Sequence, residues 1–271
     1  MNLACWRVVL SLLIAGVVPP AWQASPSPHA PHRRALPNAG IGQNPVPLSA
    51  PSVAVPVTVE ERADIAMARK RYDLALDLLH DEALRQPRNA MLWNKIGIAY
   101  HQLNQLSAAQ KAYQHALKLN SRLSEAINNL GAVYFAERKD GKAAKQFKKA
   151  IKLQGNIAAY YVNLGAVEFN RNHMDAARSS YLQALRLDPQ ALDAGGHGGT
   201  VVKFQDLHDP ARYHFLLARL YSSLGRVADA LHQFRQAQEL HYAHLDASLK
   251  DVAFAPLRQI PEFQRLMAEK P

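Results

Sequence analysis

From residue 57 onward, apolar and small positions recur with the spacing of amphipathic helices rather than of strands. In one segment they fall at i, i+3, i+4 and i+7, on a single helix face: Trp93, Ile96, Gly97 and Tyr100. After a polar turn at residues 104–105, a second helix face is marked by Ala109, Tyr113 and Ala116. The pattern therefore predicts two short helices joined by a tight turn.

This two-helix unit repeats with a period of 34 residues. The matched columns hold residues of similar size: Gly97, Gly131 and Gly165; Ala109, Ala143 and Ala177; Tyr113, Phe147 and Tyr181; Ala116, Ala150 and Ala184. One hairpin cannot bury its own apolar face, so stacked hairpins have to supply the core. We expect each glycine to face the alanine across its hairpin, and each aromatic ring to fill the space towards the next hairpin.

Length, order and spacing of these columns resemble the tetratricopeptide repeat family over residues 56–191 and 211–243. The resemblance implies an all-α fold, a right-handed superhelical solenoid of about five helix hairpins with a C-terminal capping segment. Two positions depart from the pattern. Arg62 stands where the first unit should be aliphatic, and Glu168 occupies the column of Tyr100 and Tyr134.

The repeat register divides the chain into segments. We expect four units in residues 57–191 and a fifth in 211–243. A glycine-rich insertion at 192–210, which contains Gly195 and Gly199, is predicted to be a mobile loop. Residues 244–271 are predicted to cap the last unit, and they resemble the ends of other exported bacterial proteins of this family.

The N-terminal region has a different character. Arg7 precedes an eleven-residue apolar run at residues 8–18, which predicts a signal peptide in residues 1–24, with an uncleaved anchor as the alternative. Residues 25–56 are rich in proline and predict an extended linker, or a ligand for a proline-recognising domain. Cys5 is the only cysteine, so no internal disulfide can form. We expect an exported protein, periplasmic or secreted, or held at the inner membrane by the uncleaved signal.

The resemblance implies that the first helix of each unit lines a concave groove. Three columns there are candidates for binding an extended peptide: Asn94 and Asn128; Lys95, Asn129 and Asn163; His101, Phe135 and Phe169. Asparagine is mildly unfavourable within a helix, and its amide can both donate to and accept from a peptide backbone. Family members that bind extended peptides carry asparagine at the places of Asn129 and Asn163. The alternatives are consensus residues on a wet face for the asparagines, and burial against a neighbouring helix for the His101 column.

Two further observations bear on the expected partner. The family's clamp for a C-terminal carboxylate needs lysine and asparagine, but Glu60 and Asp64 occupy those places in the first unit. The net charge is +10, and a lysine run follows the second helix of the third unit: Lys139, Lys142, Lys145, Lys148, Lys149 and Lys152. A solvated face is the ordinary interpretation, and association with an anionic envelope polymer or lipid surface is the alternative. Nucleic acid is not favoured, and self-association through the solenoid ends stays open.

The sequence contains no recognisable catalytic motif. The chain has twelve histidines, but their spacing fits no metalloenzyme pattern, and there is no phosphate loop, dinucleotide fingerprint or serine-nucleophile elbow. We therefore expect no cofactor, no functional metal and no enzymatic activity. The sequence favours a protein–protein interaction scaffold that binds an extended segment of its partner, and the envelope-associating structural protein is the alternative.

Overall fold

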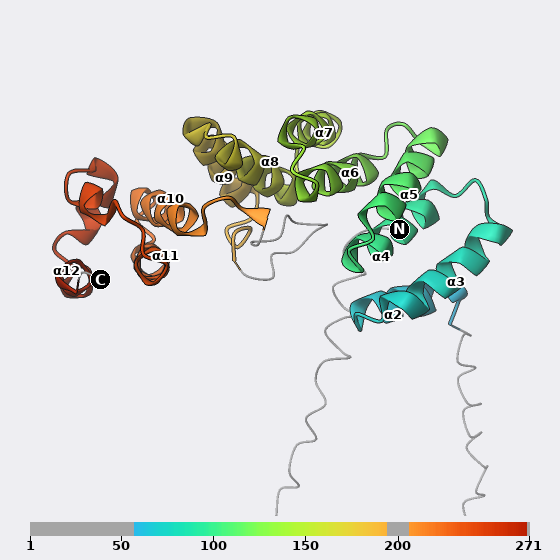
Figure 1. Ribbon diagram of the computed structural model, residues 1–271, viewed down its shortest axis with the longest axis horizontal. Coiled ribbons are helices and arrows are strands. Elements are labelled where there is room, and N and C mark those ends of the chain that lie inside the picture. Colours follow the sequence, from blue (N-terminus) through green and yellow to red (C-terminus); the bar gives the residue numbers. More distant parts are fainter. Residues whose placement is uncertain (1–56, 194–205, 270–271) are drawn as a thin grey trace, which may run out of the picture. The chain divides into compact units, whose positions relative to one another are not determined.

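A computed structural model of the chain describes residues 57–193 and 206–269. The predicted signal peptide, the proline-rich linker and the glycines of the insertion lie outside these residues. The regular elements from α2 to α12 within them are helices, most of which are labelled in Figure 1. Within the same ranges, no helix combines the length and apolar character that a membrane span requires.

Ten of these helices pair into five successive hairpins. Their bounds are α2 (Val59–Ala68) with α3 (Tyr72–Arg85), α4 (Ala90–Gln102) with α5 (Leu106–Leu119), α6 (Ser124–Ala136) with α7 (Asp140–Leu153), α8 (Ala158–Asn170) with α9 (Met174–Leu187), and α10 (Pro210–Ser223) with α11 (Val227–Glu239). Each of the first four hairpins packs against the next, and α6 contacts both α4 and α8. We call α2, α4, α6 and α8 the first-helix row, and α3, α5, α7 and α9 the second-helix row.

The same backbone turn closes each hairpin. A residue with φ between 57° and 71° follows the first helix at Lys70, Asn104, Arg138, Asn172 and Gly225. The next amide then returns to a carbonyl in the last turn of that helix, as Lys139 N does to the Tyr134 oxygen at 2.8 Å. Such left-handed residues usually end helices as glycine or asparagine, so lysine and arginine hide this turn from sequence inspection.

The glycine columns require a correction. A Cβ atom placed on Gly131 would lie 2.7 Å from the Phe147 ring, and one on Gly97 or Gly165 would lie 2.5 Å from the ring of Tyr113 or Tyr181. Each glycine therefore faces the aromatic ring of its own hairpin rather than the alanine across it. Because the ring lies over the glycine, it sets how closely the two helices approach, and all three rings are fully buried.

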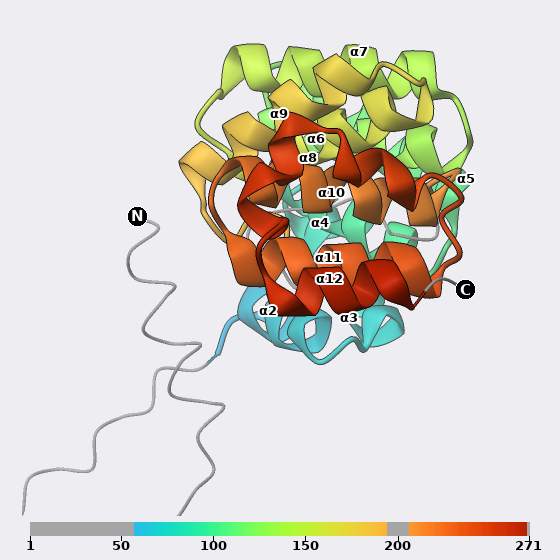
Figure 2. The same ribbon diagram turned by 90° about the vertical axis from the view of Figure 1, so that its left-hand side faces the viewer.

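The C-terminal segment covers the last hairpin. Two 3₁₀ helices, η2 (Leu245–Leu249) and η3 (Val252–Leu257), and the helix α12 (Pro261–Ala268) follow α11, and η3 and α12 contact α10 and α11 (Figure 2). Phe254 and Phe263 pack with Phe234 at ring distances of 5.8 Å and 5.0 Å. Ser222 Oγ also donates to the Ala253 oxygen at 2.6 Å. Through these contacts the C-terminal segment covers the apolar surface of the last hairpin, which is the role of a solenoid cap.

Candidate functional site

Four of the predicted groove residues form a continuous line of side-chain hydrogen bonds. Asn163 Nδ2 donates to Asn128 Oδ1 at 2.9 Å, Asn128 Nδ2 donates to Asn129 Oδ1 at 3.3 Å, and Asn129 Nδ2 donates to Asn94 Oδ1 at 3.1 Å. This asparagine ladder links α4, α6 and α8. The ladder is regular because of the 34-residue repeat: Asn128 occupies the repeat position of Asn94, and Asn163 that of Asn129.

The asparagine ladder is buried, with each side chain at most 3% exposed. Asn129 and Asn163 do not lie on a wet face, so Asn129→Ala and Asn163→Ala each remove a buried, hydrogen-bonded amide. A buried amide that loses its partner costs about 1–3 kcal/mol. The ladder therefore stabilises the junctions between hairpins, whatever it also binds.

The column of His101, Phe135 and Phe169 lies in the interior. All three side chains are buried, and the Phe169 ring packs edge-on against Tyr213 with a centroid distance of 5.6 Å. This placement favours the packing interpretation of the column, because these rings contact the core rather than an open surface.

Lys95, the remaining predicted residue, joins the first two hairpins. Its Nζ lies 2.6 Å from Glu60 Oε1 and 2.8 Å from Asp64 Oδ1, the two acidic residues that replace the family's carboxylate clamp. Burial lowers the pKa of Lys95, but hydrogen bonds to Asp64 and Glu60 outweigh it and raise the pKa above its usual value. The lysine is charged at neutral pH, and it is paired within the chain.

The structure adds a backbone-binding site that the sequence did not indicate. Asn170 Nδ2 donates to the Asp206 carbonyl at 3.0 Å, and Asn170 Oδ1 accepts from the His208 amide at 3.0 Å. Arg138 Nη1 donates to the same Asp206 carbonyl at 2.7 Å. The end of the insertion, expected to be mobile, is thus held against the ends of α6 and α8, and Leu207 is buried in the core. No periodic signal marks Asn170, since alanine and glutamine stand in its column.

Glu168, unexplained in its aromatic column, is the centre of an ionic cluster. The carboxylate is 3% exposed and lies 2.8 Å from Lys148, 3.1 Å from Arg171 and 2.8 Å from His173 Nδ1. Burial raises the pKa of Glu168, but the hydrogen bonds from Lys148 and His173 outweigh it, so the pKa lies below its usual value. Since Lys148 belongs to α7, the cluster ties the third hairpin to the fourth.

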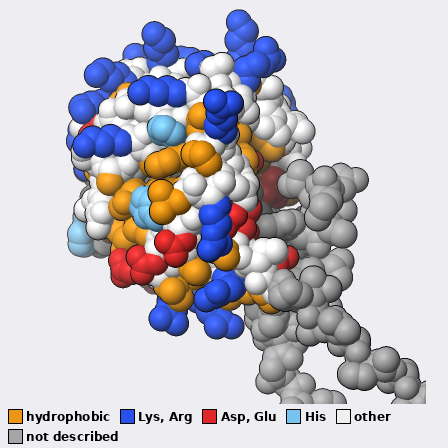
Figure 3. All heavy atoms as spheres, turned by 90° about the vertical axis from the view of Figure 1, so that its right-hand side faces the viewer, with side chains coloured by type: hydrophobic (Ala, Val, Ile, Leu, Met, Phe, Trp, Pro, Cys, Tyr) orange, Lys and Arg blue, Asp and Glu red, His pale blue; other side chains and the backbone are white. Residues whose placement is uncertain are grey.

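Three of the four helices of the second-helix row, α5, α7 and α9, carry an excess of positive charge. Helices α5, α7 and α9 together hold nine lysine and arginine residues but only two carboxylates, Asp140 and Asp175. Every lysine of α7 is exposed. Figure 3, which faces the N-terminal hairpins, shows Lys and Arg side chains gathered along its upper edge. In the described parts of the chain, no three His, Cys, Asp or Glu side chains are grouped so that they could hold a metal ion.

Family models described as tetratricopeptide repeat match residues 91–122, 128–191 and 211–243. The first hairpin, α2 with α3, lies before these ranges. No curated protein matches the chain.

Among solved structures, the chain is similar to TTC0263, a thermophilic repeat protein of this kind from Thermus thermophilus, with 21% identity over 73% of this chain and 97% of that one, at a TM-score of 0.49. It is also similar to MamA from Desulfovibrio magneticus RS-1, with 18% identity over 71% and 96%, at a TM-score of 0.47. A third is the first repeat domain of Spaghetti (RPAP3) bound to an HSP90 peptide, with 23% identity over 42% and 90%, at a TM-score of 0.41.

Proposed function

The helix hairpins of this chain belong to the tetratricopeptide repeat family, and we propose that the protein is a non-catalytic scaffold that holds an extended segment of a partner protein along its first-helix row. Repeats of this family typically serve as protein–protein interaction scaffolds. The proposal includes the position of the groove, the extended form of the ligand and a location outside the cytoplasm.

The observation that carries this proposal is the way Asn170 holds the segment at Asp206–His208. A single amide side chain donates to one backbone carbonyl and accepts from the backbone N–H two residues later. This arrangement recognises a main chain whatever its side chains are. Asn163 lies seven residues before Asn170, two turns back on the same face of α8, so the asparagine ladder and this backbone contact share one side of the helix.

Binding at the asparagine ladder would proceed by exchange of hydrogen bonds. The amides of Asn94 and Asn129 are bonded to one another, and a peptide backbone offers the same donor and acceptor. A ligand can therefore replace an amide–amide bond with amide–backbone bonds without leaving a buried group unpaired. Because the existing bonds must be broken, we expect moderate affinity and a dependence on the length of the bound segment.

The location belongs to the same proposal. The basic start and apolar run of residues 1–18 support export, and a chain that loses Cys5 with its signal would suit an oxidising compartment. If the protein is exported, its partner is expected to be a protein of the cell envelope, periplasmic or secreted.

The test is to capture partners from the cell envelope with the full chain, identify the bound segment, and measure its affinity for purified variants by calorimetry. The change Asn129→Ala with Asn163→Ala should weaken binding at least tenfold, which is about 1.4 kcal/mol. Ser222→Ala removes an equally buried hydrogen bond at the C-terminal cap, away from the first-helix row, and should leave affinity unchanged. Equal affinity in all three proteins would refute the groove.

A second candidate rests on the charge of the second-helix row. The exposed lysines of α7 could hold the protein to an anionic envelope polymer or a lipid surface, which makes it a structural rather than a peptide-binding protein. Retention of the wild-type chain on such a surface, lost at high salt and indifferent to the asparagine changes, would favour this candidate.

A further inference from the structure

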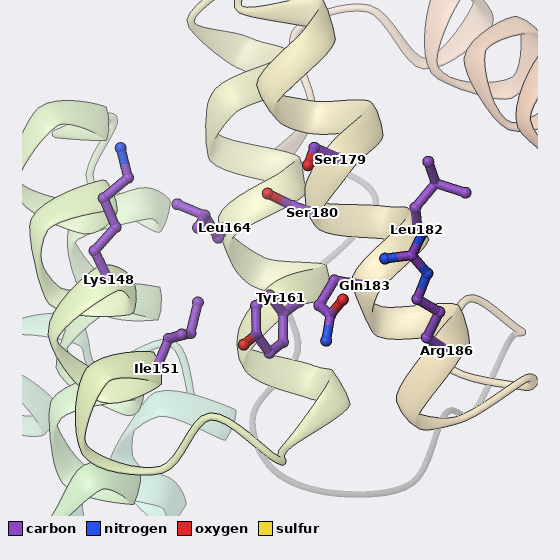
Figure 4. A pocket seen from close by; sticks show the side chains of 9 residues that line it. All are labelled: Lys148, Ile151, Tyr161, Leu164, Ser179, Ser180, Leu182, Gln183 and Arg186. Carbon is purple, nitrogen blue, oxygen red and sulfur yellow. The ribbon is translucent and has the colours of Figure 1, made fainter.

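A pocket of about 450 Å³ opens between the third and fourth hairpins, within the size range of ligand sites. Figure 4 shows Lys148 and Ile151 on α7 facing Gln183 and Arg186 on α9 across a floor formed by α8. This pocket lies between second helices, and its lining contains no member of the asparagine ladder.

The polar groups of the pocket are mostly donors, and some are not engaged by the protein. Within the described residues, the guanidinium of Arg186, the amide of Gln183 and the hydroxyl of Ser179 make no side-chain hydrogen bond or ion pair. Lys148 pairs with Glu168 at 2.8 Å but remains more than half exposed. No carboxylate lines the pocket, although Glu168 lies beside it and is already bound by Lys148, Arg171 and His173. Of the two positive side chains in the lining, Lys148 is therefore paired with Glu168, whereas Arg186 has no acidic partner among the described residues.

The remaining lining is apolar. Ile151, Leu164 and Leu182 line the pocket beside the ring of Tyr161, whose hydroxyl is held by the Gly155 carbonyl at 3.1 Å. A ligand that fits this lining has an aliphatic side chain next to a carboxylate. The guanidinium suits this carboxylate because its planar fork can donate two parallel hydrogen bonds.

We propose that this pocket between α7 and α9 binds an acidic segment of a partner protein, with Arg186 holding a carboxylate and the lining of Ile151, Leu164 and Leu182 holding an adjacent aliphatic side chain. A polypeptide fits better than a lipid surface. Proteins that sit on membranes insert several exposed apolar side chains. Helix α7 exposes lysines but no large apolar residue, and among the large apolar residues of α9 only Leu187 is exposed. This binding surface is separate from the first-helix row, so it stands or falls independently of the proposed function.

The test uses the full chain and a short fluorescent peptide of alternating glutamate and leucine, followed by fluorescence anisotropy. Arg186→Glu should weaken binding about tenfold or more, because an attraction becomes a repulsion at the carboxylate. Ser179→Trp, which fills the pocket from an exposed position, should weaken it similarly. Both positions are exposed, so the variants should fold, and circular dichroism checks that they do.

The matched control is Lys118→Glu. Lys118 lies in the last turn of α5, in the same repeat column as Arg186, but it does not line the pocket. Lys118→Glu and Arg186→Glu both replace a positive charge by a negative one. It should alter affinity by no more than about twofold, the effect of an exposed charge. A glutamate–serine peptide should bind more weakly than the glutamate–leucine peptide.

Three outcomes would overturn the proposal. Equal losses of affinity in Lys118→Glu and Arg186→Glu would mean that the peptide is attracted by the summed positive charge of α5, α7 and α9 rather than bound in the pocket. Failure of the wild-type chain to bind the glutamate–leucine peptide would remove the site. Tight retention on vesicles containing anionic phospholipid, unaffected by Ser179→Trp, would mean that α7 and α9 bind a membrane surface rather than a peptide. Changes at Asn129 and Asn163 should leave this peptide's affinity unaltered, which separates the two surfaces.

Discussion

Replacing Gly131 with alanine should destabilise the protein, although alanine is normally the better helix residue. The new Cβ atom would lie 2.7 Å and 2.9 Å from two carbons of the Phe147 ring and 3.2 Å from Gln146 Cβ. Overpacking of this kind costs about 1–3 kcal/mol. The gain in helix propensity returns about 1 kcal/mol. Because the fully buried ring has no space to move into, we expect a cost in the upper part of that range, about 2–3 kcal/mol, and hence a net loss of about 1–2 kcal/mol.

Gly141 supplies the matched control. It lies in the first turn of α7, and a Cβ atom there would meet nothing within 4 Å. Gly141→Ala should therefore be neutral or stabilising by up to about 1 kcal/mol. Thermal unfolding followed by circular dichroism measures both variants. At about 2–4 °C per kcal/mol for a chain of this size, Gly131→Ala should lower the midpoint by about 2–8 °C.

A double-mutant cycle identifies the cause. If the clash with the ring is responsible, Gly131→Ala combined with Phe147→Leu should be less destabilised than the sum of the two single changes. Additive effects, or a Gly131→Ala midpoint at or above that of the wild type, would refute the assignment of the ring as the spacer between the helices.

Other predictions concern single contacts. Glu168→Gln should lower the free energy of unfolding by about 1–3 kcal/mol in urea titrations, because it removes hydrogen bonds to a charged carboxylate. The loss should not be larger, since Lys148, Arg171 and His173 are partly exposed and can be solvated without Glu168. Since the pKa of Glu168 is lowered by folding, this difference should be full above pH 4.5 and disappear as the pH falls through the folded pKa; a difference that persists at pH 2 would contradict the ionic assignment. Asn163→Ala should cost about 1–3 kcal/mol in the same assay, and no loss would mean that its bond to Asn128 contributes nothing. Phe254→Ala should cost about 3–5 kcal/mol and loosen the C-terminal cap, as judged by faster proteolysis after α11, whereas unchanged proteolysis would contradict a packed cap.

Much of the fold follows from the 34-residue period, because a repeated column must occupy a repeated place. The positions of Trp93, Tyr113 and Ala116 on paired helices could be predicted from spacing alone, and the structure agrees. The contacts of the glycines could not be predicted, since periodicity places a residue on a helix face but does not say which neighbouring side chain packs against it. Here the ring of Phe147 displaced the expected alanine.

The candidate site was only partly predictable, for a related reason. The asparagine columns were visible, but whether an amide faces a groove or another amide depends on the offset between adjacent hairpins. Glu168 looked anomalous because its partner Lys148 lies in the preceding repeat. Asn170 and Arg138 carry no repeated signal, since they bind a segment that occurs once in the chain.

Site-specific photocrosslinking in the native cell tests the central claim most directly. Met91 lies three residues before Asn94 on the same face of α4, and its side chain is exposed, so a photoreactive residue there reports on the first-helix row. Lys111, exposed on α5 of the same hairpin and outside the α7–α9 pocket, is the control. The account predicts a partner protein crosslinked from position 91 and not from position 111. Crosslinks from position 111 alone would contradict it and move the binding surface to the second-helix row.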